Sequence, residues 1–177
     1  MSVTHFEIIP AASLENPELL RPVLESAIVD SATGESITED IESILSSIPR
    51  SEEAMPGKYA AVAWSPESVK ALGMMGLTTP GEVMRSFART SNPVELINAY
   101  VLSAARGLRI GSALVSHLER KAADQGFTEI ILNSGPRFRL SGWPFWRHTY
   151  GEPIGVARGY YGPHLDAPVW HKVLNKL

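Results

Sequence analysis

The sequence lacks several residue patterns, and each absence excludes a class of protein. None of its 177 residues is cysteine, which excludes disulfide bonds, thiolate metal sites and cysteine nucleophiles. No apolar run approaches the roughly 18 residues of a membrane-spanning helix, and the first residues lack the basic and apolar regions of a secretory signal. We therefore expect a cytoplasmic protein without a membrane segment.

An excess of positive charge is also missing, and the charge is unevenly distributed. The net charge of −3 predicts no binding to nucleic acid. Residues 1–55 carry eleven acidic and two basic residues, whereas residues 56–177 carry eight acidic and fourteen basic ones. The basic part suits a polyphosphate ligand and the acidic part a cationic one, although a solvated acidic helical surface explains the acidic part equally well.

Hydrophobic periodicity predicts alternating strands and helices. Strands are expected over residues 5–10, 58–64, 68–77, 94–102, 127–132, 152–157 and 168–174. Helices are expected over residues 17–30, 38–48, 110–125 and 141–150, with a helical turn near 83–87. Asn16 is the expected cap of the first helix, and Gly126 is expected to end the third.

The strand, helix and strand over residues 94–132 are joined by short links, which predicts parallel neighbours in one sheet. Neither a repeat nor an interdomain linker interrupts the chain. The length suits one domain with a substantial core. The pattern therefore predicts a single domain over residues 1–177, of the α/β class with a mixed sheet.

The link between the strand 94–102 and the helix 110–125 has the chemistry of an anion site. It reads Arg106-Gly107-Leu108-Arg109-Ile110-Gly111-Ser112. The glycines let an anion approach the backbone, the helix N-terminus supplies unpaired N–H groups and a positive dipole end, and the arginines suit a diphosphate. Such a turn is a weak signal alone. Another nucleotide-phosphate binder stays open, although no Lys-Ser or Lys-Thr follows the glycines as in a P-loop.

The context of this turn is more specific. Residues 99–114 resemble the signature segment of the GNAT acetyltransferase superfamily, whose pattern is Gln or Arg, two residues, Gly, one residue, then Gly or Ala. Arg106 and Gly111 match the first and last positions, whereas Arg109 replaces the middle glycine. The resemblance implies a GNAT-like acyl-CoA-binding fold with a central splayed mixed β-sheet flanked by helices. It also implies acetyl-CoA as co-substrate, no metal, and direct transfer to an amine.

The resemblance also implies which residues hold the donor. Backbone groups of the splayed strand would hold the pantetheine arm along Tyr100, Val101 and Leu102. The diphosphate would meet the turn at Arg106, Gly107, Leu108, Arg109, Gly111 and Ser112. Asn133, which follows the strand 127–132, falls where an acyl-chain or CoA contact is expected at the carboxyl edge of the sheet. A plain turn asparagine explains that residue equally well.

Amine acetylation needs a general base, and Glu95 is the candidate. A carboxylate between Val94 and Leu96 is expected to be partly desolvated, which raises its pKa. Some GNAT members place their base on this strand at the same offset from the signature arginine. The alternative is a glutamate at the strand edge that faces solvent.

The acid that protonates the departing thiolate has several candidates. In the family it is often a tyrosine on the helix after the next strand, but Trp146 stands at that position. Tyr150 is the first substitute, and Tyr160 and Tyr161 follow in a loop. Each of these tyrosines also has a structural interpretation.

Two functions therefore compete. One is an N-acetyltransferase that acts on a small-molecule amine, a peptide N-terminus or a lysine. The other is an acyl-CoA-binding module without turnover, which fits the departures at Arg109 and Trp146. The five histidines show no paired metal spacing. We expect no membrane or nucleic-acid partner, and a homodimer stays open.

Overall fold

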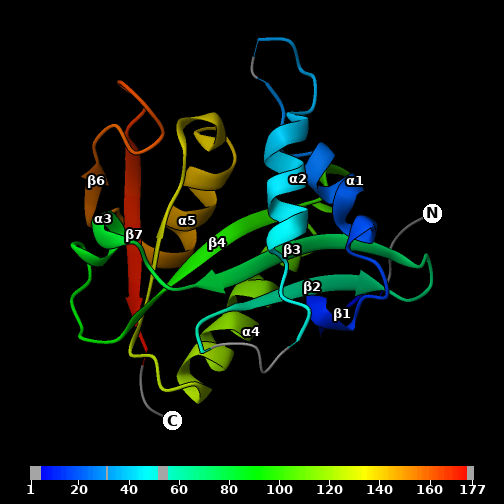
Figure 1. Cartoon of the computed structure of the whole chain (residues 1–177), viewed down its shortest axis with the longest axis horizontal. Helices are drawn as coiled ribbons and strands as arrows, with labels where there is room; N and C mark the ends of the chain where they lie inside the picture. The colour runs from blue at the N-terminus through cyan, green and yellow to red at the C-terminus, as the bar shows by residue number, and fades with distance from the viewer. Residues whose placement is uncertain (1–4, 31, 52–55, 175–177) are drawn as a thin grey trace. The chain divides into compact units, whose positions relative to one another are not determined.

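The computed structural model describes residues 5–30, 32–51 and 56–174. Its strands form a mixed seven-stranded sheet in the order β1-β2-β3-β4-β5-β7-β6, with helices flanking it (Figure 1). Contacts divide the chain into two compact units, Met1–Leu77 with Asn98–Leu118 and Thr78–Ile97 with Glu119–Leu177. Strand β4 (Pro93–Val101) and helix α4 (Ile110–Asp124) contribute residues to both units.

The first unit combines an antiparallel layer with two short helices. Its strands are β1 (Glu7–Pro10), β2 (Tyr59–Ser65) and β3 (Lys70–Thr78, with Thr78 outside the unit). Helices α1 (Arg21–Glu25) and α2 (Thr38–Ser47) lie side by side (Figure 1). One apolar core joins helices and strands, and includes Leu20, Leu24, Ile41, Leu45, Val62 and Met74.

The prediction of a helix over residues 17–30 is wrong beyond Glu25. A 3-10 helix (η2, Pro17–Leu20) leads into α1, and Asn16 accepts the N–H of Glu18 at 3.0 Å, which confirms the predicted cap. Beyond the helix the chain turns back on itself, because Val29 bridges Ser36 and the N–H groups of Ile37 and Asp30 donate to Ile28 and Glu35 at 3.0 and 2.8 Å. The Asp30 carboxylate closes this turn by accepting the N–H groups of Ala32 and Thr33 at 2.8 and 2.9 Å. Such side-chain bonds to nearby backbone compete with helix formation.

The second unit contains the parallel part of the sheet. Its strands are β5 (Glu129–Asn133), β6 (Gly155–Ala157) and β7 (Ala167–Val173), and its helices are α3 (Glu82–Arg85) and α5 (Gly142–Tyr150). Strand β7 pairs antiparallel with both β5 and β6. Met84 packs with Ile131, Ala157 and Val169 in a separate core cluster of this unit.

Strands β4 and β5 run parallel, as predicted, but they pair over only three residues. Pro93–Glu95 lies opposite Glu129–Ile131, whereas β4 continues to Val101. The positive φ of Asn98, +53°, interrupts the extended backbone three residues after the last paired residue, Glu95. The predicted parallel pairing is therefore confirmed, and it ends well before β4 does.

Helix α4 ends at Gly126, as predicted. Gly126 has a φ of +83°, which favours glycine. The N–H of Phe127 donates to Ala122 at 3.0 Å and that of Gly126 to Ala123 at 2.9 Å. This bond pair is the usual helix-terminating turn with a left-handed glycine.

Candidate active site

The turn predicted to hold a diphosphate is exposed and shaped by glycine. Arg106, Gly107, Leu108 and Arg109 are all exposed between a 3-10 turn (η3, Ser103–Ala105) and the start of α4. Gly107 has a φ of +85°, and no heavy atom lies within 4 Å of where its Cβ would stand. The turn thus presents open backbone at a helix N-terminus, the arrangement that binds phosphate.

Arg109 stands where the family pattern has glycine, and its backbone adopts the conformation that favours glycine. Its φ is +60°, in the left-handed region. Its carbonyl accepts the N–H of Ala113 at 3.0 Å and so opens the first turn of α4. The departure from the family pattern therefore adds a guanidinium group at the cost of some backbone strain.

We expect Arg109→Gly to be more stable than Arg109→Ala, with a free energy of unfolding about 1 kcal/mol higher. The reason is that only glycine adopts the left-handed conformation without a steric penalty. Both variants lose the guanidinium group, so the comparison isolates the backbone. Urea unfolding of the two variants measures the difference. Equal stabilities would show that the left-handed turn is not strained.

The residues predicted to line the pantetheine arm are half-buried at the end of β4. The side chains of Tyr100 and Leu102 pack against the core of the first unit. The Leu102 N–H donates to Leu72 at 2.8 Å, so this donor is already used within the sheet. Backbone contacts of the arm at Tyr100 and Val101 stay predictions.

Gly73 of β3 determines how closely the strands approach this point, and sequence reasoning missed it. A Cβ on Gly73 would lie 2.9 Å from the Tyr100 carbonyl oxygen and 3.2 Å from Cγ2 of Ile110. Only glycine fits so close to another backbone. A glycine inside the otherwise apolar strand was the available signal.

In the second unit, a hydrogen-bonded chain joins Glu95, Asn133 and Tyr161. The Asn133 amide donates to Glu95 Oε1 at 3.4 Å, and the Tyr161 hydroxyl donates to Asn133 Oδ1 at 2.7 Å. The ring of Tyr160 packs edge-on against that of Tyr161, with centroids 5.1 Å apart. The structure thus brings together four residues that the sequence singled out in three separate segments.

Glu95 is the most perturbed acid of this group. It is 6% exposed, although it lies on a strand. Burial raises its pKa to about 7, and a hydrogen bond from the Gly81 backbone N–H opposes the rise. The expected desolvation is confirmed and the solvent-facing alternative is wrong. A role as general base stays a prediction.

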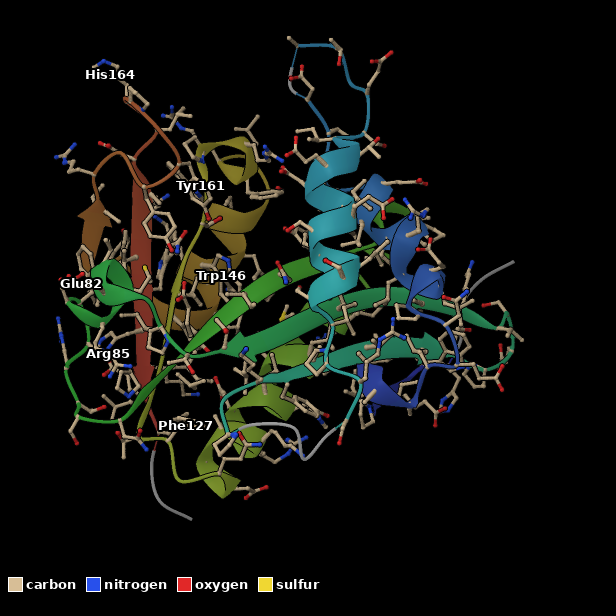
Figure 2. The ribbon with its side chains drawn as sticks, viewed as in Figure 1. Glu82, Arg85, Phe127, Trp146, Tyr161 and His164 are labelled. Atoms are coloured by element: carbon tan, nitrogen blue, oxygen red, sulfur yellow. The ribbon has the colours of Figure 1, made fainter. Side chains whose placement is uncertain are left out.

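The two tyrosines lie on a loop between β6 and β7 that its own hydrogen bonds hold in shape. Asp166 accepts the Gly159 N–H at 2.8 Å and pairs with Arg158 at 2.6 Å. Figure 2 shows Tyr161 and, at the tip of the loop, His164. Burial and the nearby charge of Glu95 raise the pKa of Tyr160, while a hydrogen bond with Asn133 opposes the rise.

The profile of the acetyltransferase (GNAT) family matches residues 38–146, well over half of the chain. The chain belongs to the GNAT acetyltransferase family. The family and the fold class predicted from the sequence are therefore confirmed. No curated protein matches the sequence.

Solved GNAT structures share the fold at low sequence identity. An acetyltransferase from Staphylococcus aureus Mu50 is 18% identical with a TM-score of 0.66, over 97% of this chain and 100% of that one. An aminoglycoside 6'-N-acetyltransferase complexed with coenzyme A is 17% identical with a TM-score of 0.65, over 96% and 97%. The aminoglycoside 6'-N-acetyltransferase from Enterococcus faecium is 19% identical with a TM-score of 0.63, over 96% and 97%.

Tyr150, the first substitute for the GNAT tyrosine, lies apart from the Glu95 chain. Its hydroxyl donates to Glu119 at 3.0 Å, and Lys172 donates to the other oxygen of that carboxylate at 2.8 Å. Burial and Glu119 raise the pKa of Tyr150. Lys172 and His171 point to opposite faces of β7, and His171 is in register with Ile131 and thus with Glu95. The hydrogen bond of Tyr150 to Glu119 thus joins α5 to α4, and a role of Tyr150 as the acid stays a prediction.

Trp146 occupies the position of the GNAT tyrosine and belongs to the core. It is 4% exposed, and its ring centroid lies 4.8 Å from that of Phe145 and 5.8 Å from that of Tyr150. Trp146 is therefore a core residue, whereas Phe145 and Tyr150 are half-buried.

Two absences apply to residues 5–30, 32–51 and 56–174. Nowhere in these ranges do three histidine, aspartate or glutamate residues gather closely enough to bind a metal ion. None of the helices in the same ranges has the length and apolar character to cross a bilayer.

Sequence reasoning missed the segment that covers Glu95. Gly81 donates its N–H to the Glu95 carboxylate, and the Met84 sulfur lies 3.4 Å from the Asn133 amide nitrogen. The turn residues within 78–93 predict a loop, but they do not predict that this loop packs on Glu95.

Proposed function

We propose that this GNAT protein transfers the acetyl group of acetyl-CoA directly to a primary amine. The observation that carries the proposal is Glu95. A buried carboxylate with a pKa of about 7 is ionised in half of the molecules near neutral pH, which is where a general base works best. Neither Gly81 nor Asn133 is a charged partner that would hold it permanently ionised.

In this proposal Glu95 accepts a proton from the amine as the amine nitrogen bonds to the thioester carbon. A backbone N–H of β4 stabilises the oxyanion that forms. The carbon–sulfur bond then breaks, and a tyrosine hydroxyl gives its proton to the sulfur. The products are the N-acetyl amine and the free thiol, and the Glu95 proton returns to the tyrosine through solvent.

The donor would be held by the turn Arg106–Ser112. Its open backbone at Gly107, the N-terminus of α4 and the charges of Arg106 and Arg109 suit a diphosphate. The arm would meet backbone at Tyr100 and Val101. We treat the whole chain as one acyltransferase domain in this proposal.

The acceptor is an amine whose identity the proposal leaves to experiment. A small molecule, a peptide N-terminus and a protein lysine all supply the required nucleophile. Because aminoglycoside N-acetyltransferases share this fold, polyamine-like small molecules are the first panel to test.

Tyr160 is the proposed acid and Tyr161 a positioning residue. Both tyrosines hydrogen-bond Asn133, but only the Tyr161 hydroxyl donates its proton to the Asn133 oxygen at 2.7 Å, whereas the pKa of Tyr160 is also raised by the nearby charge of Glu95. We expect Tyr160→Phe to lower kcat by roughly 10²-fold without weakening CoA binding, the usual contribution of a general acid. Tyr161→Phe is expected to have a smaller effect.

The two phenylalanine variants form a matched pair, since each removes one hydroxyl from adjacent residues. Tyr150→Phe is the further comparison and is expected to lower stability rather than turnover. If Tyr160→Phe and Tyr161→Phe kept the wild-type kcat and Tyr150→Phe had a lowered kcat, Tyr150 would be the acid instead.

Product analysis tests the function itself. The protein is incubated with acetyl-CoA and a panel of amines, and released thiol and N-acetyl amine are quantified together. We expect equal amounts of the two products. CoA binding without turnover on any amine would support the alternative, a binding module, which the buried Trp146 at the family's acid position favours.

A further inference from the structure

A second buried carboxylate, Glu129, shares a face of the sheet with Glu95. Pro93 and Glu95 of β4 are in register with Glu129 and Ile131 of β5, so Glu95 and Glu129 point the same way. Glu129 is 0% exposed, compared with 6% for Glu95. The two acids therefore lie under the same cover, one strand and two residues apart.

The two carboxylates differ in how their oxygens are satisfied. Glu129 Oε2 accepts the backbone N–H groups of Arg89 and Thr90 at 2.8 and 2.9 Å. Its other oxygen lies 2.6 Å from Nδ1 of His171. Glu129 thus has three short partners, whereas Glu95 has one backbone N–H and a long bond from Asn133.

These bonds fix both ends of the segment 78–92, which contains α3. At one end Gly81 and Met84 contact Glu95 and Asn133. At the other end Glu129 holds Arg89 and Thr90. A helix of four residues has no stability of its own, so the place of the segment depends on such anchors.

The segment also carries the apolar cover. Met84 is fully buried, and Phe87 packs so closely on β6 that a Cβ on Gly155 would lie 2.7 Å from its ring. Thr128 also holds the far end of the segment, through bonds of 2.7 Å to the Thr90 hydroxyl and 2.9 Å to the Asn92 carbonyl. Loss of the Glu129 bonds to Arg89 and Thr90 would therefore loosen the stretch between α3 and Thr90, where Met84 and Phe87 are then held mainly by apolar contacts. Water would then reach the carboxylate beneath it.

We infer that Glu129 is a positioning residue for Glu95, and that it acts through the backbone of 78–92 to keep Gly81 and Met84 on the Glu95–Asn133 pair. The inference rests on the proposed role of Glu95 as the base. The position of the segment, however, can be tested without any turnover.

The charged and titratable groups around Glu95 come from four elements. Tyr160 faces it from the β6–β7 loop, His171 lies in its row on β7, and Glu129 lies on β5. On α3, Glu82 and Arg85 are exposed (Figure 2). Among these groups, only Glu129 has direct bonds to the backbone of the covering segment.

The test is the pKa of Glu95 in Glu129→Leu, read from a carboxyl ¹³C NMR titration assigned with Glu95→Gln. Leucine fills the space but accepts no hydrogen bond. We expect the pKa to fall by at least one unit, from about 7 toward the 4.5 of a solvated glutamate. Glu129→Asp, which keeps the charge but withdraws the oxygens, is expected to shift it in the same direction.

Glu119→Leu is the matched control. It removes a carboxylate that bonds Tyr150 and Lys172 on the other face of β7, so it loosens the unit without touching 78–92. We expect the Glu95 pKa to stay at about 7 in this variant. A folded Glu129→Leu or Glu129→Asp protein with an unchanged pKa would overturn the inference, and so would an equal fall in Glu119→Leu. Failure of turnover alone would count against the proposed function and not against this inference.

Discussion

Replacing Glu95 by glutamine is expected to lower kcat/KM by roughly 10²–10⁴-fold near pH 7, the usual contribution of a general base. Glutamine keeps the size of the side chain and the hydrogen bond from Gly81, so only the proton acceptor is lost. The loss should shrink at higher pH, where the amine deprotonates in solution. A wild-type rate and pH profile in Glu95→Gln would exclude Glu95 as the base.

The same substitution is expected to raise stability. The folded pKa of Glu95, about 7, lies above its ordinary value of 4.5. Its contribution to stability is therefore complete below pH 4.5 and is lost as the pH rises through 7. Linkage sets this loss at roughly 3 kcal/mol. The wild-type protein should lose this much relative to Glu95→Gln between pH 4.5 and 8 in urea unfolding, and parallel curves would contradict the burial of charge.

Gly111→Trp is expected to weaken CoA binding by at least about tenfold, or 1.4 kcal/mol. Gly111 is the second residue of α4, where free backbone N–H groups would meet the diphosphate, and an indole there blocks their approach. Calorimetric titration with CoA measures the change.

Ser116→Trp provides the control for this variant. Ser116 is exposed on the same helix, so it tests the cost of a tryptophan away from the turn. Its affinity for CoA should match that of the wild type. Equal affinities in all three proteins would place the donor elsewhere.

The parts of the fold that were predictable depend on local chemistry. Apolar periodicity marked α4 and its flanking strands, and Asn16 and Gly126 marked helix ends because capping is decided within a few residues. The predicted helix over residues 17–30 was too long because a local turn follows it. The chain reverses between Ile28 and Ile37 in a turn closed by the Asp30 side chain, and periodicity does not detect such a turn.

The arrangement of the site depended on contacts far apart in sequence. Asn133 and Tyr161 meet because β5 pairs with β7, and the sequence marked both residues without linking them. Desolvation of Glu95 followed from its apolar neighbours, but its cover by Gly81 and Met84 did not. Helical spacing made Tyr150 a candidate for the acid, but it did not predict the hydrogen bond of Tyr150 to Glu119, 31 residues away.

The comparison of Glu95 and Glu129 shows why neither burial nor residue type identifies a base. Both are nearly inaccessible glutamates on one face of the sheet. The Glu129 carboxylate makes three short hydrogen bonds, whereas the Glu95 carboxylate makes fewer and can still accept a proton from a substrate. The number of hydrogen bonds to each carboxylate therefore distinguishes Glu129, which holds the backbone of residues 89 and 90, from Glu95, the candidate general base.

The pH dependence of kcat/KM, measured with two acceptor amines of different pKa, tests the central role of Glu95 most directly. The account predicts an acidic limb of one proton at about pH 7 that stays in place for both amines, because it belongs to the free enzyme. An acidic limb that moves with the pKa of the amine, or no limb between pH 5 and 8, would contradict it.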